Sequence, residues 1–214
     1  MARGFVIALL GAESTGKTTL AHDLCEALVA PDRRVVVVNE YLREFCEREG
    51  RTPHAHEQRH IADEQTRRIE AATRDHDLVI ADTTALMIAV YSDLIFGDTL
   101  LYASAQAAHA QCDLTLLTAL DLAWQADGLQ RDGPHVQEPV DALVRGALDR
   151  AGFGYSVIAG TGAARLQGAL ACIQRATEAP MPAPAPAAVR TRWHWHCDRC
   201  GDSDCERRTL LPTI

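Results

Sequence analysis

The sequence predicts an α/β fold in which five parallel strands form one sheet with helices on both faces. Short apolar runs without polar alternation are typical of strands buried on both sides. Segments with helical spacing separate these runs, and such alternation predicts right-handed crossovers between parallel strands. The predicted strands are residues 5–10, 34–38, 78–82, 114–119 and 155–159. The predicted helices are residues 18–29, 53–75, 85–96, 100–112, 136–151 and 162–178, with a further helix opening at residue 39.

The first elements are marked by their apolar spacing. Residues 5–10 are continuously apolar and lead into Gly11, and the following helix places Leu20, Leu24 and Leu28 on one side. Pro31 and the adjacent aspartate break the chain before a strand that is rich in valine. The segment 53–75 is polar, with Glu/Arg pairs at helical spacing, and this pattern predicts an exposed helix.

The later elements follow from similar patterns. The third strand ends on Asp82, and residues 85–96 and 100–112 have helical spacing. Asp-Gly and Gly-Pro pairs mark residues 121–134 as a loop. Gly152 and Gly154 end the helix 136–151 before the fifth strand, and a last helix closes the fold.

Composition narrows the possible functions. The 214 residues fit one α/β domain with a short appendage, and 47% hydrophobic residues can form a core. The net charge of −8 repels phosphate backbones, so nucleic acid is not expected as a partner. The apolar runs are too short to span a membrane, and the first one is too short for a signal peptide. The expected location is therefore cytoplasmic.

The chain divides at an Ala/Pro-rich stretch. Residues 1–178 carry the α/β pattern, residues 179–192 form the linker, and residues 193–214 form a tail rich in cysteine and histidine. The linker composition favours an extended spacer outside the fold. The tail is therefore expected to hang from the domain as a separate short element, and it could bind a protein partner.

One motif carries the strongest functional prediction. Residues 11–18 read GAESTGKT, which matches G-x-x-x-x-G-K-[ST] between a predicted strand and a predicted helix. In such a P-loop, backbone N–H groups surround phosphate oxygens, the lysine reaches the β- and γ-phosphates, and the hydroxyl binds Mg²⁺. Lys17 is the single lysine among 21 Lys and Arg residues. The motif predicts binding of ATP and Mg²⁺ through Gly11, Glu13, Ser14, Thr15, Gly16, Lys17, Thr18 and Thr19.

Three further candidates lie beyond strand ends, where ligands bind in open α/β sheets. Asp82 could hold the magnesium shell together with Thr18, and the alternative is a helix N-cap at residues 82–84. Glu40 could accept a proton from a substrate hydroxyl, with Arg43 steadying substrate or phosphate. The alternative for Glu40 is a first-turn residue favoured by the helix dipole.

The loop after the fourth strand is a candidate lid. Arg131 could neutralise charge on the transferring phosphoryl group, and Asp127 with Gly128 could contact the nucleotide. The alternative is an exposed loop arginine. Four other residues, His54, His56, His60 and His109, are expected at the surface of helices.

The tail could form a small metal site. One imidazole and three thiolates would satisfy tetrahedral Zn²⁺, and the candidate ligands are His196, Cys197, Cys200 and Cys205. The alternatives are reactive thiols or a redox pair. The sequence leaves these possibilities open.

Four segments together resemble a known family. They are residues 11–18, 39–45 (NEYLREF), 80–84 (IADTT) and 124–128 (WQADG). Over roughly the first 175 residues, the chain resembles the ribosylnicotinamide kinase domain of the bacterial NAD-biosynthesis regulator and the related P-loop ATPase/kinase family. It differs at Asn39, where the family commonly has tryptophan, and at Gln130, where the lid arginine usually lies. The regulator's adenylyltransferase module has no counterpart here, so that activity is not expected.

The resemblance implies a nucleoside-kinase-like fold and ATP-dependent phosphorylation of the 5′-hydroxyl of nicotinamide riboside, in NAD salvage. It implies that Glu40 lies at the substrate ribose, that Arg43 contacts substrate or phosphate, and that residues 127–131 form the lid. Two alternatives stay open: an ATP-binding regulatory or ATPase module with a partner-binding tail, and a deoxynucleoside kinase.

Overall fold

The computed structural model describes residues 3–125 and 133–178 of the chain. The sheet has five parallel strands in the order β2-β3-β1-β4-β5. In chain order the strands are β1 (Phe5–Leu10), β2 (Val35–Val38), β3 (Leu78–Asp82), β4 (Leu114–Thr118) and β5 (Ser156–Ile158). All five predicted strands are present, and their bounds agree with the prediction to within one residue at each end.

The helices connect the strands in the predicted alternation. They are α1 (Lys17–Leu28), α2 (Tyr41–Glu49), α3 (Gln58–Asp75), α4 (Ala85–Phe96), α5 (Tyr102–His109), α6 (Gln137–Ala151) and α7 (Gly162–Glu178). Two short 3-10 turns, η1 (Ala55–Glu57) and η3 (Pro134–Val136), precede α3 and α6. No helix in the described part of the chain is both long and apolar enough to cross a membrane.

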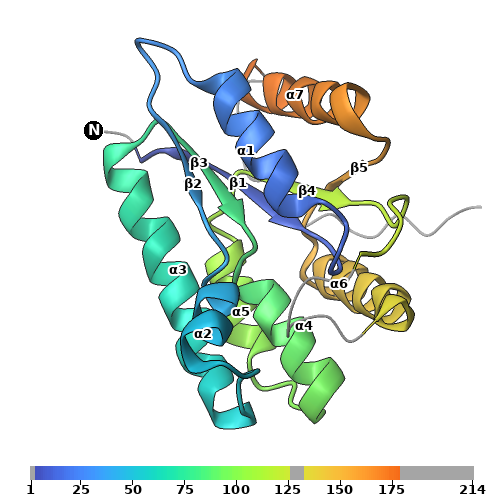
Figure 1. Ribbon diagram of the computed structural model, residues 1–214. Helices are drawn as coiled ribbons and strands as arrows, with labels where there is room; N and C mark the ends of the chain where they lie inside the picture. Colours follow the sequence, from blue (N-terminus) through green and yellow to red (C-terminus); the bar gives the residue numbers. More distant parts are fainter. Residues whose placement is uncertain (1–2, 126–132, 179–214) are drawn as a thin grey trace, which may run out of the picture. The chain divides into compact units, whose positions relative to one another are not determined.

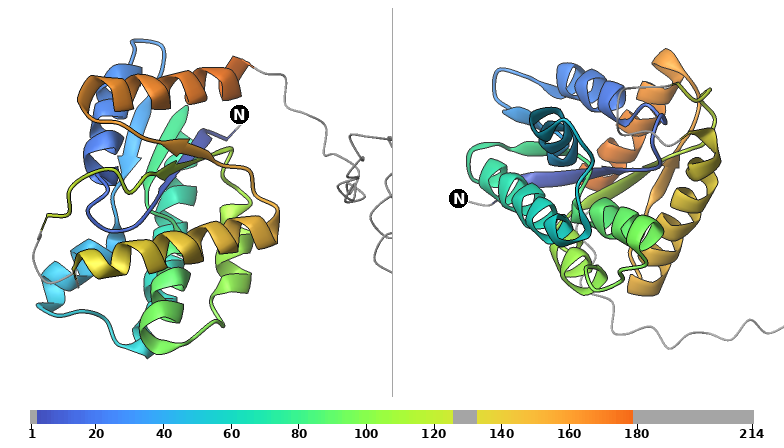
Figure 2. Two further views of the ribbon diagram at one scale, coloured as in Figure 1. Left: turned by 90° about the vertical axis from the view of Figure 1, so that its right-hand side faces the viewer. Right: turned by 60° about the horizontal axis from the view of Figure 1, so that its bottom comes forward.

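Helices cover the two faces of the sheet in separate layers. Helices α1 and α7 lie side by side on one face, and α3, α4, α5 and α6 lie on the other (Figures 1 and 2). Successive strand residues serve opposite layers: Ile7 and Leu9 pack in the cluster with α1 and α7, whereas Leu10 packs in the cluster with α4 and α6. This alternation explains why the strands read as uninterrupted apolar runs.

Helix α4 forms the centre of the second layer. Its residues from Ala85 to Val90 are all at most 3% exposed, so the helix is apolar on every side at its start. It contacts α3, α5 and α6. Helix α3 was predicted to be exposed, but its inner face is buried through Ile61, Ala62 and Gln65. The prediction holds only for the outer face, which carries the pairs of Glu64 with two arginines.

Candidate nucleotide and acceptor site

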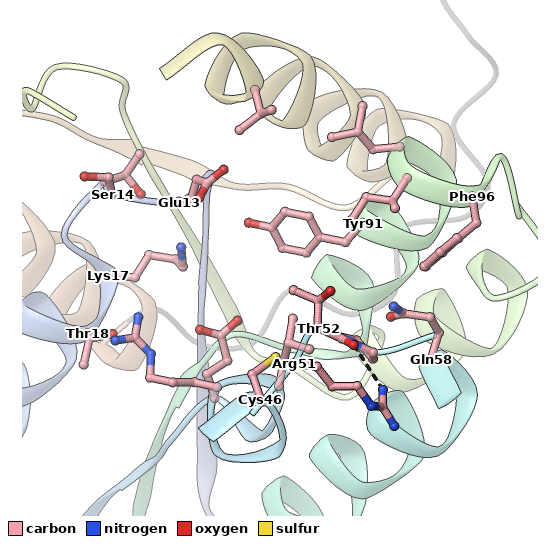
Figure 3. Close-up of a pocket in the computed structure, with 18 of the residues that line it drawn as sticks. Glu13, Ser14, Lys17, Thr18, Cys46, Arg51, Thr52, Gln58, Tyr91 and Phe96 are labelled. Carbon is pink, nitrogen blue, oxygen red and sulfur yellow. Dashed lines mark hydrogen bonds between the residues drawn. The ribbon is translucent and has the colours of Figure 1, made fainter. Parts of the chain in front are cut away.

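A cavity of about 650 Å³ opens beyond the carboxyl ends of the strands, within the size range of small-molecule sites. Its walls come from the P-loop, α2, the loop before α3 and the last turns of α4 (Figure 3). The lining includes Glu13, Ser14, Thr15, Gly16, Lys17, Thr18, Thr19, Glu40 and Arg43. The structure therefore brings most of the residues predicted for the site into one cavity.

Two glycines allow the P-loop to curl. Gly11 has φ 145°, and a Cβ built there would lie 2.0 Å from Thr118 Oγ1, so no side chain fits. Gly16 is the N-cap of α1 in the left-handed region, with φ 75°. No side chain among the described residues caps this helix, so its first N–H groups are available to an anion. The loop is held by Thr15, whose hydroxyl donates to Ala12 O at 2.7 Å.

The Lys17 ammonium lies over the loop. Its Nζ donates to Gly11 O at 3.0 Å and to Ala12 O at 2.9 Å. The side chain points into the cavity (Figure 3). This position suits a cation that meets the phosphates of a nucleotide cradled by the loop.

Thr18, which lines the cavity, is hydrogen-bonded to Asp82 at the end of β3. Thr18 Oγ1 donates to Asp82 Oδ2 at 2.6 Å, and Asp82 is 2% exposed. Asp82 Oδ1 is also buried, and no described residue donates a hydrogen bond to it. A buried carboxylate beside a hydroxyl is the oxygen donor set that Mg²⁺ takes, together with phosphate oxygens and water. The N-cap of α4 is instead Thr84, whose hydroxyl accepts from Leu86 N, so the alternative for Asp82 does not apply.

Glu40 lies at the N-cap of α2, but its side chain makes no capping hydrogen bond. Both Glu40 and Arg43 line the cavity, and the acidic residue in the first turn of α2 is Glu44. A carboxylate that faces the cavity is placed to accept a proton from a bound hydroxyl. The geometry therefore favours the pocket role of Glu40 over a purely helical one.

Sequence reasoning missed a buried glutamine that supports two site residues. Gln65 Oε1 accepts the backbone N–H of Tyr41 at 2.8 Å, next to Glu40, and its Nε2 donates to Thr83 O at 3.1 Å, next to Asp82. Thr83 has φ 83°, an unfavourable conformation for a β-branched residue. Gln65 thus holds the strained turn after β3 against the start of α2. The sequence signal that could have identified it is a polar residue at a position of helix α3 that faces the interior.

Sequence reasoning also missed Arg165, which is 5% exposed in α7. Its guanidinium donates to Thr15 O at 2.6 Å, to Gly160 O at 2.9 Å and to Asp121 Oδ1 at 3.0 Å. Burial by itself would raise the pKa of Asp121, but the Gly160 N–H and Arg165 together lower it. The arginine connects the P-loop to the segments after β4 and β5.

The predicted lid lies partly outside the described residues. Asp127, Gly128 and Arg131 fall in residues 126–132, so their roles remain predictions. Both flanks of this segment contact the P-loop. Gln125 N donates to Ser14 Oγ at 2.7 Å, and Gln137 Nε2 donates to Glu13 O at 2.9 Å. These contacts place Gln125 and Gln137 beside the phosphate cradle.

One histidine prediction is wrong. His54, His56 and His60 are exposed, but His109 is 2% exposed and packs beside Phe153. Its ring nitrogens lie 3.3 Å from Thr84 Oγ1 and 2.9 Å from Thr115 Oγ1. Burial lowers the pKa of His109 to about 4, so the ring is neutral and bridges two hydroxyl groups. The apolar inner face of α5 explains why the residue is drawn inside.

The proposed zinc ligands, His196, Cys197, Cys200 and Cys205, lie outside the described residues. Within residues 3–125 and 133–178, no group of three or more His, Cys, Asp or Glu side chains could hold a metal ion. The zinc prediction for the tail therefore stays a prediction. A magnesium site of the kind formed at Thr18 and Asp82 needs fewer protein ligands, because phosphates and water supply the rest.

Solved structures with the same fold include NadR proteins and kinases. Two crystal structures of NadR protein, one in complex with NR and one with NAD and AMP-PNP, have TM-scores of 0.67 and 0.65 at 19% and 18% identity. They cover 84% and 86% of this chain, which spans 52% of each NadR chain. A thymidylate kinase from Ehrlichia chaffeensis has a TM-score of 0.58 at 15% identity, covering 81% of this chain and 100% of its own.

A deoxyadenosine kinase from M. mycoides has a TM-score of 0.54 at 13% identity, covering 79% of this chain and 99% of its own. These likenesses establish the nucleoside-kinase-like P-loop fold.

Comparison with the sequences of curated proteins gives no match. A family model described as an AAA domain (AAA_28) matches residues 6–165, which is more than half of the chain. The chain therefore belongs to the AAA_28 family of P-loop domains.

Proposed function

We propose that this protein is an ATP- and Mg²⁺-dependent kinase that phosphorylates the 5′-hydroxyl of a nucleoside, with nicotinamide riboside as the leading substrate, in NAD salvage. The observation that carries the proposal is the single cavity that joins a complete P-loop to the Glu40 carboxylate. A nucleotide-binding module without an acceptor would not need the second half of this cavity. The NadR structure in complex with NR shares the fold and supports the choice of acceptor.

The residues divide the chemistry between them. The P-loop N–H groups and Lys17 would hold the β- and γ-phosphates, and Thr18 with Asp82 would hold Mg²⁺. The metal would supply charge neutralisation at the phosphates. Glu40 would orient the acceptor hydroxyl and accept its proton as the bond to phosphorus forms and the bond to the ADP oxygen breaks. Arg43 would steady the acceptor or the phosphoryl group.

The test is a coupled, continuous assay of ADP release with Mg-ATP and nicotinamide riboside. The rate should rise and saturate with the riboside and stay low without it. If the rate with nicotinamide riboside is no faster than the rate without it, this riboside is not the substrate. A panel of deoxynucleosides in the same assay would then identify a deoxynucleoside kinase. ATP binding without turnover on any nucleoside would instead indicate a regulatory module.

Two variants test the role of Lys17. Lys17→Ala should abolish turnover, because it removes the cation that meets the phosphates. Lys17→Arg keeps the charge but replaces a compact ammonium with a bulkier planar group, and it should also be inactive. Normal rates in Lys17→Ala would show that the phosphoryl-transfer mechanism is wrong.

A further inference from the structure

The end of the cavity away from the P-loop has a different chemical character. Figure 3 shows Gln58 and Phe96 on the opposite side of the view from Lys17 and Thr18, with Tyr91 drawn between them. Apolar side chains from α2, the loop before α3 and α4 line this end, namely Leu42, Pro53, Tyr91, Leu94, Ile95 and Phe96. An apolar and aromatic wall suits a planar ring rather than a phosphate.

Polar residues also line this end, namely Arg51, Thr52, His54 and Gln58, and Gln58 differs from the others in its burial. It is 2% exposed, and its Oε1 atom is buried without a hydrogen bond from any described residue. A buried acceptor that no donor meets destabilises the folded protein. Gln65, also on α3, offers the contrast, because it is 0% exposed and its amide bonds both Tyr41 N and Thr83 O. Gln58 also lines the cavity, so a molecule bound there is the candidate donor for this acceptor.

The backbone around Gln58 is held in place by an ion pair. Arg51 NH1 and NH2 donate to the two carboxylate oxygens of Glu57, each at 2.7 Å, and His54 N donates to the same carboxylate at 2.7 Å. Arg51, followed by the His54 N–H, lowers the pKa of Glu57 to about 2. Because Gln58 directly follows Glu57, these bonds fix where its side chain enters the cavity. A recognition residue needs support of this kind.

From this arrangement we infer that Gln58 recognises an amide group on the ring of the acceptor nucleoside. A carbonyl next to an N–H, either in a carboxamide on the ring or in the edge of a nucleobase, matches the acceptor and donor of the glutamine amide. The ring itself packs against the aromatic wall formed by Tyr91 and Phe96. This inference rests on the proposed kinase function, and it names the group by which the site selects its acceptor.

The experiment compares ligands that differ only in the amide. Values of kcat/KM and Kd are measured for nicotinamide riboside and for pyridinium riboside, which lacks the carboxamide. The wild-type protein should prefer the amide by about tenfold or more, because a site that hydrogen-bonds a polar group rejects a ligand without it. In Gln58→Leu, the kcat/KM and Kd values of the two ribosides should agree to within about threefold, because the variant has no side-chain amide to bond the carboxamide. Uridine and thymidine serve as ligands that carry the amide within the ring.

Gln106→Leu is the matched control. This glutamine donates to Ala147 O between α5 and α6 and does not line the cavity, so the variant should keep the wild-type preference. Melting temperatures check that both variants fold. The ratio of kcat/KM between the two ribosides in the wild-type protein tests the inference even if a variant fails to fold. A Gln58-dependent preference for uridine or thymidine would support the inference and identify the nucleobase as the source of the amide.

Two failures are distinguishable. Phosphorylation of both ribosides at equal kcat/KM by the wild-type protein would overturn the role of Gln58 and leave the kinase proposal standing. Selective binding of the amide ligand without phosphate transfer would support Gln58 recognition and overturn the kinase proposal. Binding without preference in the wild-type protein, or an unchanged preference in folded Gln58→Leu, would also overturn the role of Gln58.

Discussion

Replacing Arg165 with leucine removes a buried cation that holds three segments together. The guanidinium donates to carbonyl oxygens of Thr15 and Gly160 and to the Asp121 carboxylate. Its side chain is 6% exposed, whereas that of Asp121 is 33% exposed. Leucine would leave the carbonyls without this donor and the carboxylate without its cation. The P-loop would lose its connection to α7.

The expected loss of stability is large for one substitution. Breaking a buried ion pair by removing one partner costs about 3–5 kcal/mol, and the partial exposure of Asp121 favours the lower end. A domain of this size loses about 2–4 °C in Tm for each kcal/mol. Arg165→Leu should therefore lower the Tm by about 6–12 °C. It should also weaken ATP binding, because Thr15 belongs to the phosphate cradle.

Calorimetric unfolding and titration with ATP measure the two effects separately. Arg165→Lys is the informative companion, because its single ammonium cannot serve three acceptors in a fixed fork, and it should fall between wild type and leucine. Asp121→Asn, combined with Arg165→Leu in a double-mutant cycle, isolates the contribution of the ion pair. A fall in Tm of less than about 2 °C with unchanged ATP affinity would refute the role assigned to Arg165.

Three other substitutions test the site and its surroundings. Asp82→Asn should raise the Mg²⁺ concentration needed for half-maximal activity by about 10- to 100-fold, measured by metal titration at saturating ATP; an unchanged requirement would remove Asp82 from the metal site. Glu40→Gln should lower kcat by about 100-fold or more with the KM for ATP nearly unchanged, and a normal kcat would exclude proton transfer to this carboxylate. His109 has a folded pKa of about 4 against 6.5 for the free side chain, so the unfolded chain binds the additional proton between these values. Stability should therefore fall by about 3 kcal/mol as the pH drops from 6.5 to 4, and chemical denaturation of His109→Gln should show a flatter profile.

Much of the fold could be predicted from the sequence because its cues are local. The run Phe5–Leu10 and the following glycine indicate a buried strand and a tight turn without any tertiary information. A helix end was also predictable from glycine at Gly152, which adopts the left-handed conformation. Strand order is different, because no local pattern states that β1 lies between β3 and β4.

Candidate site residues could be chosen from the sequence where a residue type has a fixed chemical role, and their roles stay predictions. Lys17 and Thr18 belong to a motif whose spacing is set by the phosphates it binds, and Asp82 ends an otherwise apolar strand. Whether Asp82 caps α4 needed the structure, which shows that the side chain accepting from Leu86 N is that of Thr84. The metal role of Asp82 stays a prediction. Placement of the lid and tail residues stays a prediction.

The sequence by itself determined the P-loop, the alternation of strands and helices, and the residues at the strand ends, because each depends on neighbours within a few positions. Only the tertiary structure decided the partners of Arg165, Gln58, Gln65 and His109. Their surroundings are built from segments far apart in the chain, such as Thr15 with Arg165. A buried polar side chain is satisfied or left open by whatever packing brings beside it, and that arrangement has no local pattern.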